Sequence, residues 1–354
     1  MILPKYTYLI SNRAPSDPDN YIGPVTYQTA PNNNHRPYLS TPFKVVPSDA
    51  WNHALAADLE TRYAGSSDVW DIAFYIHGYA TSERYAQLGL ESYGLLLSSV
   101  GFDRGILVGV SWPSNTWTYG NAQTNAATSK ALLSACGQVV TRLRANIGRR
   151  PVRATIFCHS MGNYLLSMSL VNGATLPSID SIFLLAADVD YALWDRTSAS
   201  YPQGVAVAKA AGHVYVLYTP NDAVLGDSGW VNWVYRLGYY GAKSGAQLPK
   251  NVSQIDYSAW GNDPYCLDYV PYSYYNTLAG RGALVHSSSK FVPDLISLQN
   301  HALQNVPRSS LNVPAARDLA RIVSLISLPW TPGKPVARKS APATKGAGVK
   351  RGKG

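Results

Sequence analysis

The chain has 354 residues, 46% of them hydrophobic, which is enough to build a sizeable core. Its three cysteines, Cys136, Cys158 and Cys266, are widely scattered, which argues against a disulfide framework and against a CxxC metal pair. No stretch approaches the roughly 18 to 20 consecutive apolar residues of a membrane span. The first residues also lack the basic, apolar and small-residue order of a signal peptide. We therefore expect a protein of the reducing cytoplasm with no transmembrane segment.

The net charge of +9 comes mostly from the final segment, residues 334–354. This segment holds seven basic residues and no acidic one, so the rest of the chain carries a charge of only +2. We expect a folded domain over residues 1–330 and a disordered basic tail over residues 331–354, because a segment rich in Lys, Ala, Pro and Gly buries no apolar face. Weak contact with a polyanion is one role for the tail. A solubilising or unselected extension is favoured over this role, since no aromatic platform or folded basic groove accompanies the charge.

Along the chain, apolar runs of strand length alternate with longer amphipathic stretches. This alternation predicts an α/β protein with a mostly parallel central sheet and helices on both faces. We expect strands at residues 5–11, 71–76, 106–111, 152–157, 181–187, 213–218 and 252–257. We expect helices at residues 51–63, 82–100, 121–147, 163–168 and 315–326, and we interpret the Pro/Asn-rich residues 15–42 as a polar stretch.

One motif, Cys158-His159-Ser160-Met161-Gly162, lies between an apolar run and a helix-like stretch. A serine on a tight strand-to-helix turn holds its hydroxyl clear of the backbone, and the first amides of the helix point toward an oxyanion beside it. The turn requires a small side chain at its first position, which Cys158 provides. We interpret Ser160 as a nucleophile and the Met161 amide as an oxyanion donor. A serine between short residues also occurs in ordinary loops, so the rest of the chain must decide.

A second motif, His77-Gly78-Tyr79, follows the expected strand at residues 71–76. In parallel sheets, active sites form at the carboxyl ends of the strands, so this turn is expected beside the serine. A glycine turn there can present backbone amides, and acyl transfer needs two converging N–H groups. We interpret the Tyr79 amide as the second oxyanion donor; an ordinary glycine turn is the alternative.

A serine hydroxyl needs a histidine base, and the base needs an acid to orient it. In this architecture the order along the chain is serine, acid, histidine, with the histidine in a late loop. His286 meets this requirement, whereas His301 is better explained as a surface residue. The other five histidines lie in unsuitable places: His35, His53, His77, His159 and His213.

Three aspartates follow apolar runs late in the chain. Asp222 comes shortly after residues 213–218, between the serine and the histidine, and we interpret it as the acid of the triad. A turn or helix cap made with Asn221 is the structural alternative. Asp188 and Asp190 follow the preceding run and are the alternative acids.

These motifs, in this order, resemble a known family over about residues 5–325. The family is an uncharacterised, mostly prokaryotic group of α/β-hydrolase-like proteins. The resemblance implies an α/β-hydrolase fold with Ser160 as nucleophile, Asp222 as acid and His286 as base. It is carried by Ser11-Asn12-Arg13, Phe74 to Tyr79, Val110 to Ser114, His159 to Asn163, Ala186 to Asp190, Asn221-Asp222 with Arg236-Leu237-Gly238, and His286-Ser287.

The sequence departs from the family at Cys158, where glycine or alanine is usual, and in a long aromatic insertion at about residues 226–282. Because the insertion joins two members of the predicted triad, we expect it to lie over the site, where tyrosines could line an acyl or aromatic pocket. Trp112, Trp260 and Tyr265 are the candidate pocket residues. A loop packed on its own rings is an equal alternative.

The residues together predict a serine hydrolase that cleaves a small-molecule or lipid-like carboxylic ester through an acyl-enzyme intermediate. No metal and no organic cofactor is expected. A thioesterase, amidase or acyltransferase would use the same triad. A binding or scaffold protein on a hydrolase fold is the alternative of a different class.

Overall fold

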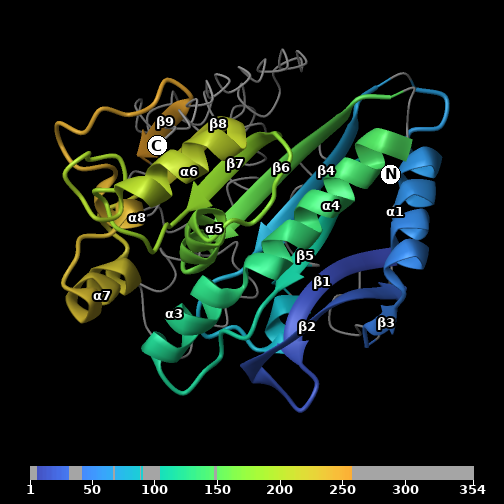
Figure 1. The fold of residues 1–354 in the computed structure, drawn as a ribbon, viewed down its shortest axis with the longest axis horizontal. Helices are drawn as coiled ribbons and strands as arrows, with labels where there is room; N and C mark the ends of the chain where they lie inside the picture. The colour runs from blue at the N-terminus through green and yellow to red at the C-terminus, as the bar shows by residue number, and fades with distance from the viewer. Residues whose placement is uncertain are drawn as a thin grey trace, which may run out of the picture.

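The structure is a computed structural model that describes residues 6–31, 42–66, 68–87, 89–90, 104–146 and 150–256. The described residues form a nine-stranded sheet in the order β3-β2-β1-β5-β4-β6-β7-β8-β9 (Figure 1). The strands are β1 (Tyr6–Ala14), β2 (Asp17–Pro31), β3 (Lys44–Val46), β4 (Trp70–Ile76), β5 (Ile106–Ser111), β6 (Val152–His159), β7 (Ile179–Leu185), β8 (Ala211–Tyr218) and β9 (Val252–Asp256).

Most neighbouring strands of the sheet are parallel. Among the described strands, only β1 with β2 and β2 with β3 pair antiparallel. The central strands are short, buried apolar runs, as expected for parallel strands covered on both faces. Strand β6 is paired on one side with β4, where Cys158 lies opposite Ile76, and on the other with β7, where His159 lies opposite Leu185. The carboxyl ends of β4, β6 and β7 therefore meet at one edge of the sheet.

Helices cover one face of the sheet, where the main core lies. Figure 1 shows α4, α5 and α6 side by side across this face, with α1 at the β1–β2 end. The side chains of β6 alternate, so Ala154, Ile156 and Cys158 belong to this core. The helices are α1 (Ser48–Arg62), α3 (Tyr119–Thr128), α4 (Lys130–Asn146), α5 (Gly162–Val171), α6 (Tyr201–Ala210), α7 (Ala223–Asn232) and α8 (Leu237–Tyr240).

The opposite face of the sheet carries a row of stacked rings from three adjacent strands. Phe157 stacks on Phe183 with ring centres 4.9 Å apart, and Phe183 lies 4.8 Å from Tyr215. These residues occupy equivalent register positions on β6, β7 and β8. Cross-strand aromatic pairs of this kind stabilise a sheet.

The expected strands are present. The interpretation of residues 15–42 as a polar stretch without a strand was wrong for residues 17–31. Residues 17–31 form β2, which pairs with β1 through a tight connection at residues 15 and 16. Arg13 explains why this polar segment is ordered. Its Nη1 donates to the carbonyl oxygen of Pro18 at 2.8 Å, and it forms an ion pair with Asp19 at 3.2 Å.

The expected long helix over residues 121–147 is two helices, α3 and α4, with a break at Ser129. The Ser129 hydroxyl donates to the carbonyl oxygen of Asn125 at 2.7 Å and accepts from Nδ2 of Asn12 at 3.0 Å. A serine that bonds back to the preceding turn bends or interrupts a helix. The break also ties α3 to the end of β1.

The predicted helix at residues 315–326 lies outside the described residues, and so do the basic tail and most of the aromatic insertion. The helix predicted at residues 82–100 falls largely outside them as well, although residues 83–87 are helical. Among the described residues, no helix combines the length and apolar character needed to cross a bilayer.

Candidate active site

Ser160 lies at the turn between β6 and α5, at the carboxyl edge of the sheet. Its φ is +53°, a left-handed conformation that costs energy for a residue with a side chain. Only 6% of the residue is exposed. A strained serine on a strand-to-helix turn is the geometry in which the hydroxyl stands clear of the backbone.

Two glycines allow the turn after β4 to approach Ser160. A Cβ atom on Gly78 would lie 2.7 Å from Cβ of Ser160. A Cβ atom on Gly162 would lie 2.7 Å from the carbonyl oxygens of Ile76 and His77. Neither position has room for a larger residue, so the glycine turn after β4 lies directly against the candidate nucleophile.

Asn163 fixes the strained turn through its side-chain amide. Its Nδ2 is within hydrogen-bond distance of three carbonyl oxygens, at 3.1 Å from Cys158, 2.9 Å from Ser160 and 3.3 Å from Leu185. The Ser160 amide in turn donates to the carbonyl oxygen of Leu185 at 2.9 Å. Hydrogen bonds therefore connect the turn both to the start of α5 and to the end of β7. They hold Ser160 in a left-handed conformation that a residue with a side chain would otherwise disfavour.

The amides of Tyr79 and Met161 are the predicted oxyanion donors. The turn that carries Tyr79 is fixed by Ser114, whose carbonyl oxygen accepts from the Ala80 amide at 2.9 Å and whose hydroxyl accepts from the Thr81 amide at 3.2 Å. Within the described part of the chain, neither the Tyr79 amide nor the Met161 amide has a hydrogen-bond acceptor. Two N–H groups beside a serine are thus left for another acceptor.

His77 holds the glycine turn through contacts with Gly78, Trp112 and Arg13. Its Nε2 accepts from the Trp112 amide at 3.2 Å and faces Nη2 of Arg13 at 3.3 Å. Both of these groups are donors only, so Nε2 carries no proton and Nδ1, 3.0 Å from the carbonyl oxygen of Gly78, carries it. Burial lowers the pKa of Arg13 to about 10, so its guanidinium remains charged at neutral pH. His77 is a structural histidine, as its place in the turn suggested.

Trp112, a candidate pocket residue, lies beneath the turn. It is fully buried, its ring stacks on His77 with centres 5.6 Å apart, and its Nε1 donates to the carbonyl oxygen of His77 at 2.9 Å. A ring without exposed surface cannot contact a ligand, so the expectation that Trp112 forms a pocket wall is corrected. The residue supports the glycine turn after β4.

Asp222, the predicted acid, is fully buried after the end of β8. It is the N-cap of α7, where its Oδ1 accepts from the Leu225 amide at 3.0 Å. Capping therefore accounts for one carboxylate oxygen, and the capping alternative describes part of what this residue does. Strand β8 is two strands from β6, and the two are parallel through β7, so Asp222 lies at the same edge of the sheet as Ser160.

Asp188, an alternative acid, is part of a buried polar cluster. Its Oδ2 accepts from the Tyr119 hydroxyl at 2.5 Å, its Oδ1 accepts from the Ser228 hydroxyl at 2.5 Å, and Nε of Arg236 is 3.1 Å away. Burial, reinforced by the charge of Asp188, raises the pKa of Tyr119, so the phenol keeps the proton that it donates. Both carboxylate oxygens of Asp188 are therefore engaged.

Asp190, the other alternative acid, holds the loop after β7. Its Oδ1 accepts from the Ala192 amide at 2.9 Å, and its Oδ2 accepts from the hydroxyls of Ser198 and Ser200 at 3.2 and 2.7 Å. Like Asp188, it already has hydrogen bonds to both oxygens. The predicted base His286 and the candidate pocket residues Trp260 and Tyr265 lie outside the described residues.

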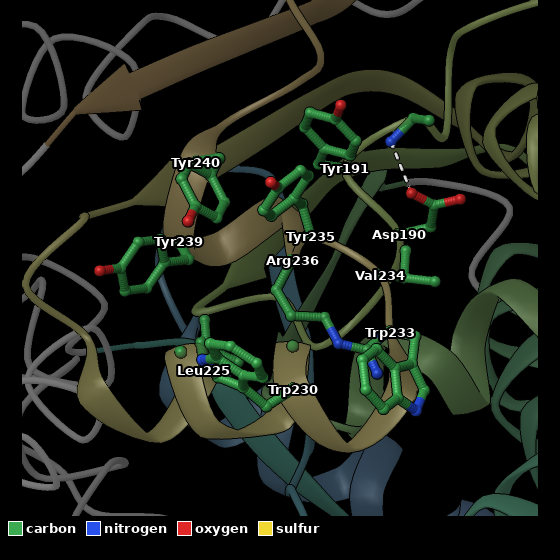
Figure 2. Close-up of a pocket in the computed structure, with 13 residues that line it drawn as sticks. Asp190, Tyr191, Leu225, Trp230, Trp233, Val234, Tyr235, Arg236, Tyr239 and Tyr240 are labelled. Atoms are coloured by element: carbon green, nitrogen blue, oxygen red, sulfur yellow. Dashed lines mark hydrogen bonds between the residues drawn. The ribbon is translucent and has the colours of Figure 1, made fainter.

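The described start of the aromatic insertion lines a cavity of about 700 Å³ between α7, α8 and the loop after β7 (Figure 2). One charged residue of each sign, Asp190 and Arg236, contributes to its wall. Within the described ranges, no group of three or more His, Cys, Asp or Glu side chains could hold a metal ion. The rings that line the cavity are Tyr191, Trp230, Trp233, Tyr235, Tyr239 and Tyr240.

Residues 51–259 match the family described as alpha/beta hydrolase of unknown function (DUF900). The chain belongs to this family. The match covers the strands that carry the glycine turn, Ser160 and Asp222, and the order of the sheet agrees with the α/β-hydrolase fold expected from the sequence motifs. No curated protein matches the chain.

Three solved structures are similar to this member of the alpha/beta hydrolase family, each at low identity. An IroE-like serine hydrolase from Shewanella oneidensis is 9% identical, with 91% of this chain and 100% of that chain covered and a TM-score of 0.34. A mutant of the esterase E40 is 12% identical, with coverage of 72% and 93% and a TM-score of 0.28. A hyperthermophilic esterase from the archaeon Pyrobaculum calidifontis is 10% identical, with coverage of 64% and 76% and a TM-score of 0.27. Such scores carry no inference about activity.

Two residues of the site, Asn163 and Arg236, belong to the sequence motifs, but the sequence analysis predicted no function for them. Asn163 directly follows the serine motif, and an amide side chain at the start of a helix is a signal for contacts with the turn before it. Arg236 gave no comparable signal, because its partner Asp188 belongs to a distant part of the chain and the two meet only in the folded sheet.

Proposed function

We propose that this protein is a serine hydrolase that cleaves a carboxylic ester, with Ser160 as nucleophile. The observation that supports this best is the backbone of Ser160. The residue has a φ of +53°, Gly78 lies against it, and two amides beside it have no acceptor among the described residues. Strain of this kind persists only where the surroundings impose it, and it concentrates at functional sites.

The proposed reaction proceeds through an acyl-enzyme. The Ser160 hydroxyl attacks the ester carbonyl carbon while His286 accepts its proton, and the amides of Met161 and Tyr79 stabilise the oxyanion. His286 then protonates the leaving alcohol as the carbon–oxygen bond of the ester breaks. A water molecule attacks the acyl-enzyme with His286 again as base, which releases the acid and restores Ser160.

We assign the acid of the triad to Asp222. Its position after β8, between the serine and the histidine in the order of the chain, supports this. Oδ1 of Asp222 caps α7, and in the proposed triad the carboxylate would hold and orient His286. The cap itself would keep the carboxylate in one rotamer.

Hydrolysis of p-nitrophenyl butyrate tests the proposal. We expect Ser160→Ala to lower kcat by about a thousandfold or more while the melting temperature changes little, because only the reacting oxygen is removed. The matched control is Ser178→Ala, an exposed serine on a loop, which should retain full activity. Unchanged turnover in Ser160→Ala would exclude this serine as the nucleophile.

A panel of leaving groups separates ester hydrolysis from the related reactions. A butyryl thioester, a butyryl anilide and butyrate transfer to an added alcohol would report thioesterase, amidase and acyltransferase activity with the same triad. We expect the oxygen ester to have the highest kcat/KM. Absence of turnover across the whole panel, from folded protein, would favour the binding or scaffold alternative.

A further inference from the structure

Arg13, the last residue of the motif Ser11-Asn12-Arg13, is a buried charge near the glycine turn that the proposed triad does not use. Its side chain is 1% exposed. A guanidinium has five N–H donors in a fixed plane, so it cannot turn without breaking several hydrogen bonds at once. Its five acceptors are the Ser111 hydroxyl, the Pro18 carbonyl oxygen, the Asp19 carboxylate, the Thr81 carbonyl oxygen and Nε2 of His77. Contacts on β2, on β5 and on the glycine turn therefore hold the guanidinium in place.

The contacts of His77 determine which of its ring nitrogens carries a proton. Nε2 faces two groups that only donate, Nη2 of Arg13 at 3.3 Å and the amide of Trp112 at 3.2 Å. Nδ1 therefore carries the proton and donates to the carbonyl oxygen of Gly78 at 3.0 Å. Because both nitrogens are engaged in this way, His77 is not placed to accept a proton from Ser160, although Gly78 lies directly against that serine.

The carbonyl group that His77 holds belongs to the same peptide group as the Tyr79 amide. A trans peptide group is planar, so the C=O of Gly78 and the N–H of Tyr79 point in opposite directions. A hydrogen bond that fixes the carbonyl therefore also fixes the direction of the N–H. The same bond polarises the peptide group, which makes the N–H a stronger donor.

Ser114 holds the part of the turn that follows this peptide group. Its carbonyl oxygen accepts from the Ala80 amide at 2.9 Å. Its hydroxyl accepts from the Thr81 amide at 3.2 Å and donates to the Thr81 carbonyl oxygen at 3.1 Å. These contacts explain how Ala80 keeps a φ of +53°, but they do not reach the carbonyl oxygen of Gly78. That oxygen is held by His77.

We propose that His77 is a positioning residue for the ester hydrolysis, and that Arg13 keeps it in the required tautomer. The Nδ1–H of His77 holds the Gly78–Tyr79 peptide so that the Tyr79 N–H faces the oxyanion that forms beside Ser160. His77 does not touch the substrate, because it acts through the backbone. The inference rests on the proposed function and adds to it a residue outside the triad.

Nitrogen-15 NMR of the full chain, labelled on histidine, tests the tautomer without any measurement of activity. We expect His77 at pH 7 to be neutral with its proton on Nδ1, and the loss of its signals in His77→Asn assigns them. A proton on Nε2, or a doubly protonated ring, would overturn the proposal. The measurement uses the wild-type chain, so its result does not depend on the stability of a variant.

Two substitutions of His77 separate positioning from packing. In His77→Asn, Nδ2 takes the place of Nδ1 and can still donate to Gly78. In His77→Gln, the amide takes the place of Nε2, where it meets Arg13 and Trp112 but does not reach the Gly78 carbonyl. For p-nitrophenyl butyrate we expect kcat within about threefold of wild type in His77→Asn and at least about tenfold lower in His77→Gln, with KM within about twofold in both. Both variants lose the ring that stacks on Trp112, so similar decreases in melting temperature are expected.

The comparison of these variants distinguishes the possible outcomes. Equal losses of kcat in the two variants, or an effect on KM alone, would show that His77 only packs beneath the turn. His53→Gln, which changes an exposed histidine in α1, is the control and should retain full activity. Wild-type protein without turnover would overturn the proposed function and this inference together, whereas active wild type with equal losses in the two variants would overturn this inference alone.

Discussion

At the scale of single residues, backbone strain is concentrated near Ser160 and the aromatic cavity. Among the described residues, the non-glycine positions with positive φ are Ala80, Ser160, Ala186 and Trp233. The first three follow β4, β6 and β7 at the carboxyl edge of the sheet, and the fourth ends α7 at the cavity. Each such residue costs about 1–3 kcal/mol, so the contacts that hold it are as important as the residue itself.

Asn163 is the residue that we expect to sustain the strain at Ser160. Asn163→Ala removes the donor shared by three carbonyl oxygens and should lower the free energy of unfolding by about 1–3 kcal/mol. Urea denaturation followed by circular dichroism measures the change. Asn121→Ala, an exposed asparagine in α3, is the control and should be within about 0.5 kcal/mol of wild type. A stability loss no larger than that of the control would show that the turn is held by other contacts.

The cysteines near the site should be chemically inert in the folded protein. Burial raises the pKa of Cys136 to about 12 and raises that of Cys158 well above its usual value. Because the thiolate is the reactive form, both groups stay protonated and unreactive between pH 7 and pH 9. We expect peptide mapping after iodoacetamide treatment at pH 8 to find neither residue modified until denaturant is added. Modification of Cys158 in the native state would mean that the interior of the turn is open to solvent.

At the scale of elements, close backbone approaches decide which glycines can be replaced. A Cβ on Gly137 in α4 would lie 2.3 Å from the carbonyl oxygen of Thr175, whereas a Cβ on Gly120 in α3 would meet nothing within 4 Å. Helix propensity alone favours alanine at both sites by up to about 1 kcal/mol. We therefore expect changes of opposite sign.

Thermal melting of the two variants measures this difference. Gly120→Ala should raise the melting temperature slightly, and Gly137→Ala should lower it, with a net loss of about 1–3 kcal/mol from the steric clash. If Gly137→Ala were as stable as wild type, α4 would not pack as closely against the segment before β7 as the structure shows.

Elements with a strong apolar pattern could be predicted from the sequence, and elements held by specific side chains could not. The central parallel strands are buried on both faces, so each is a short apolar run whose place is evident; β5 lies over the expected residues 106–111. Strand β2 is polar and partly exposed, and it is ordered through Arg13, which no local pattern reveals. The break between α3 and α4 depends on a contact of Ser129 with the distant Asn12.

At the scale of the whole molecule, the order of the strands brings the candidate site together. The glycine turn follows β4, Ser160 follows β6 and Asp222 follows β8, and these strands are parallel to one another. The order of motifs along the chain was therefore sufficient to predict one common edge. The cluster of Asp188, Tyr119, Ser228 and Arg236 was not predictable, because it joins four segments through side chains whose pairing depends on the finished sheet.

The order of the strands also brings two structural features to this edge of the sheet, the turn at Ser160 and the aromatic cavity. The turn at Ser160 lies against the turn after β4, and Arg236, the residue before α8, is a buried cation beside the aromatic cavity. Both belong to one rigid network, since the backbone of Ser160 is hydrogen-bonded to Leu185 and Asp188 at the end of β7.

Reaction with a fluorophosphonate probe tests the central claim most directly, because such probes form a covalent bond with an activated serine. We expect intact-mass analysis to show a single adduct on the folded protein, peptide mapping to place it on Ser160, and Ser160→Ala to remain unlabelled. Labelling should be slower by about a thousandfold in His286→Ala, which lacks the proposed base. Folded protein that stays unlabelled, or an adduct at a residue other than Ser160, would contradict the assignment of this turn as the nucleophilic centre.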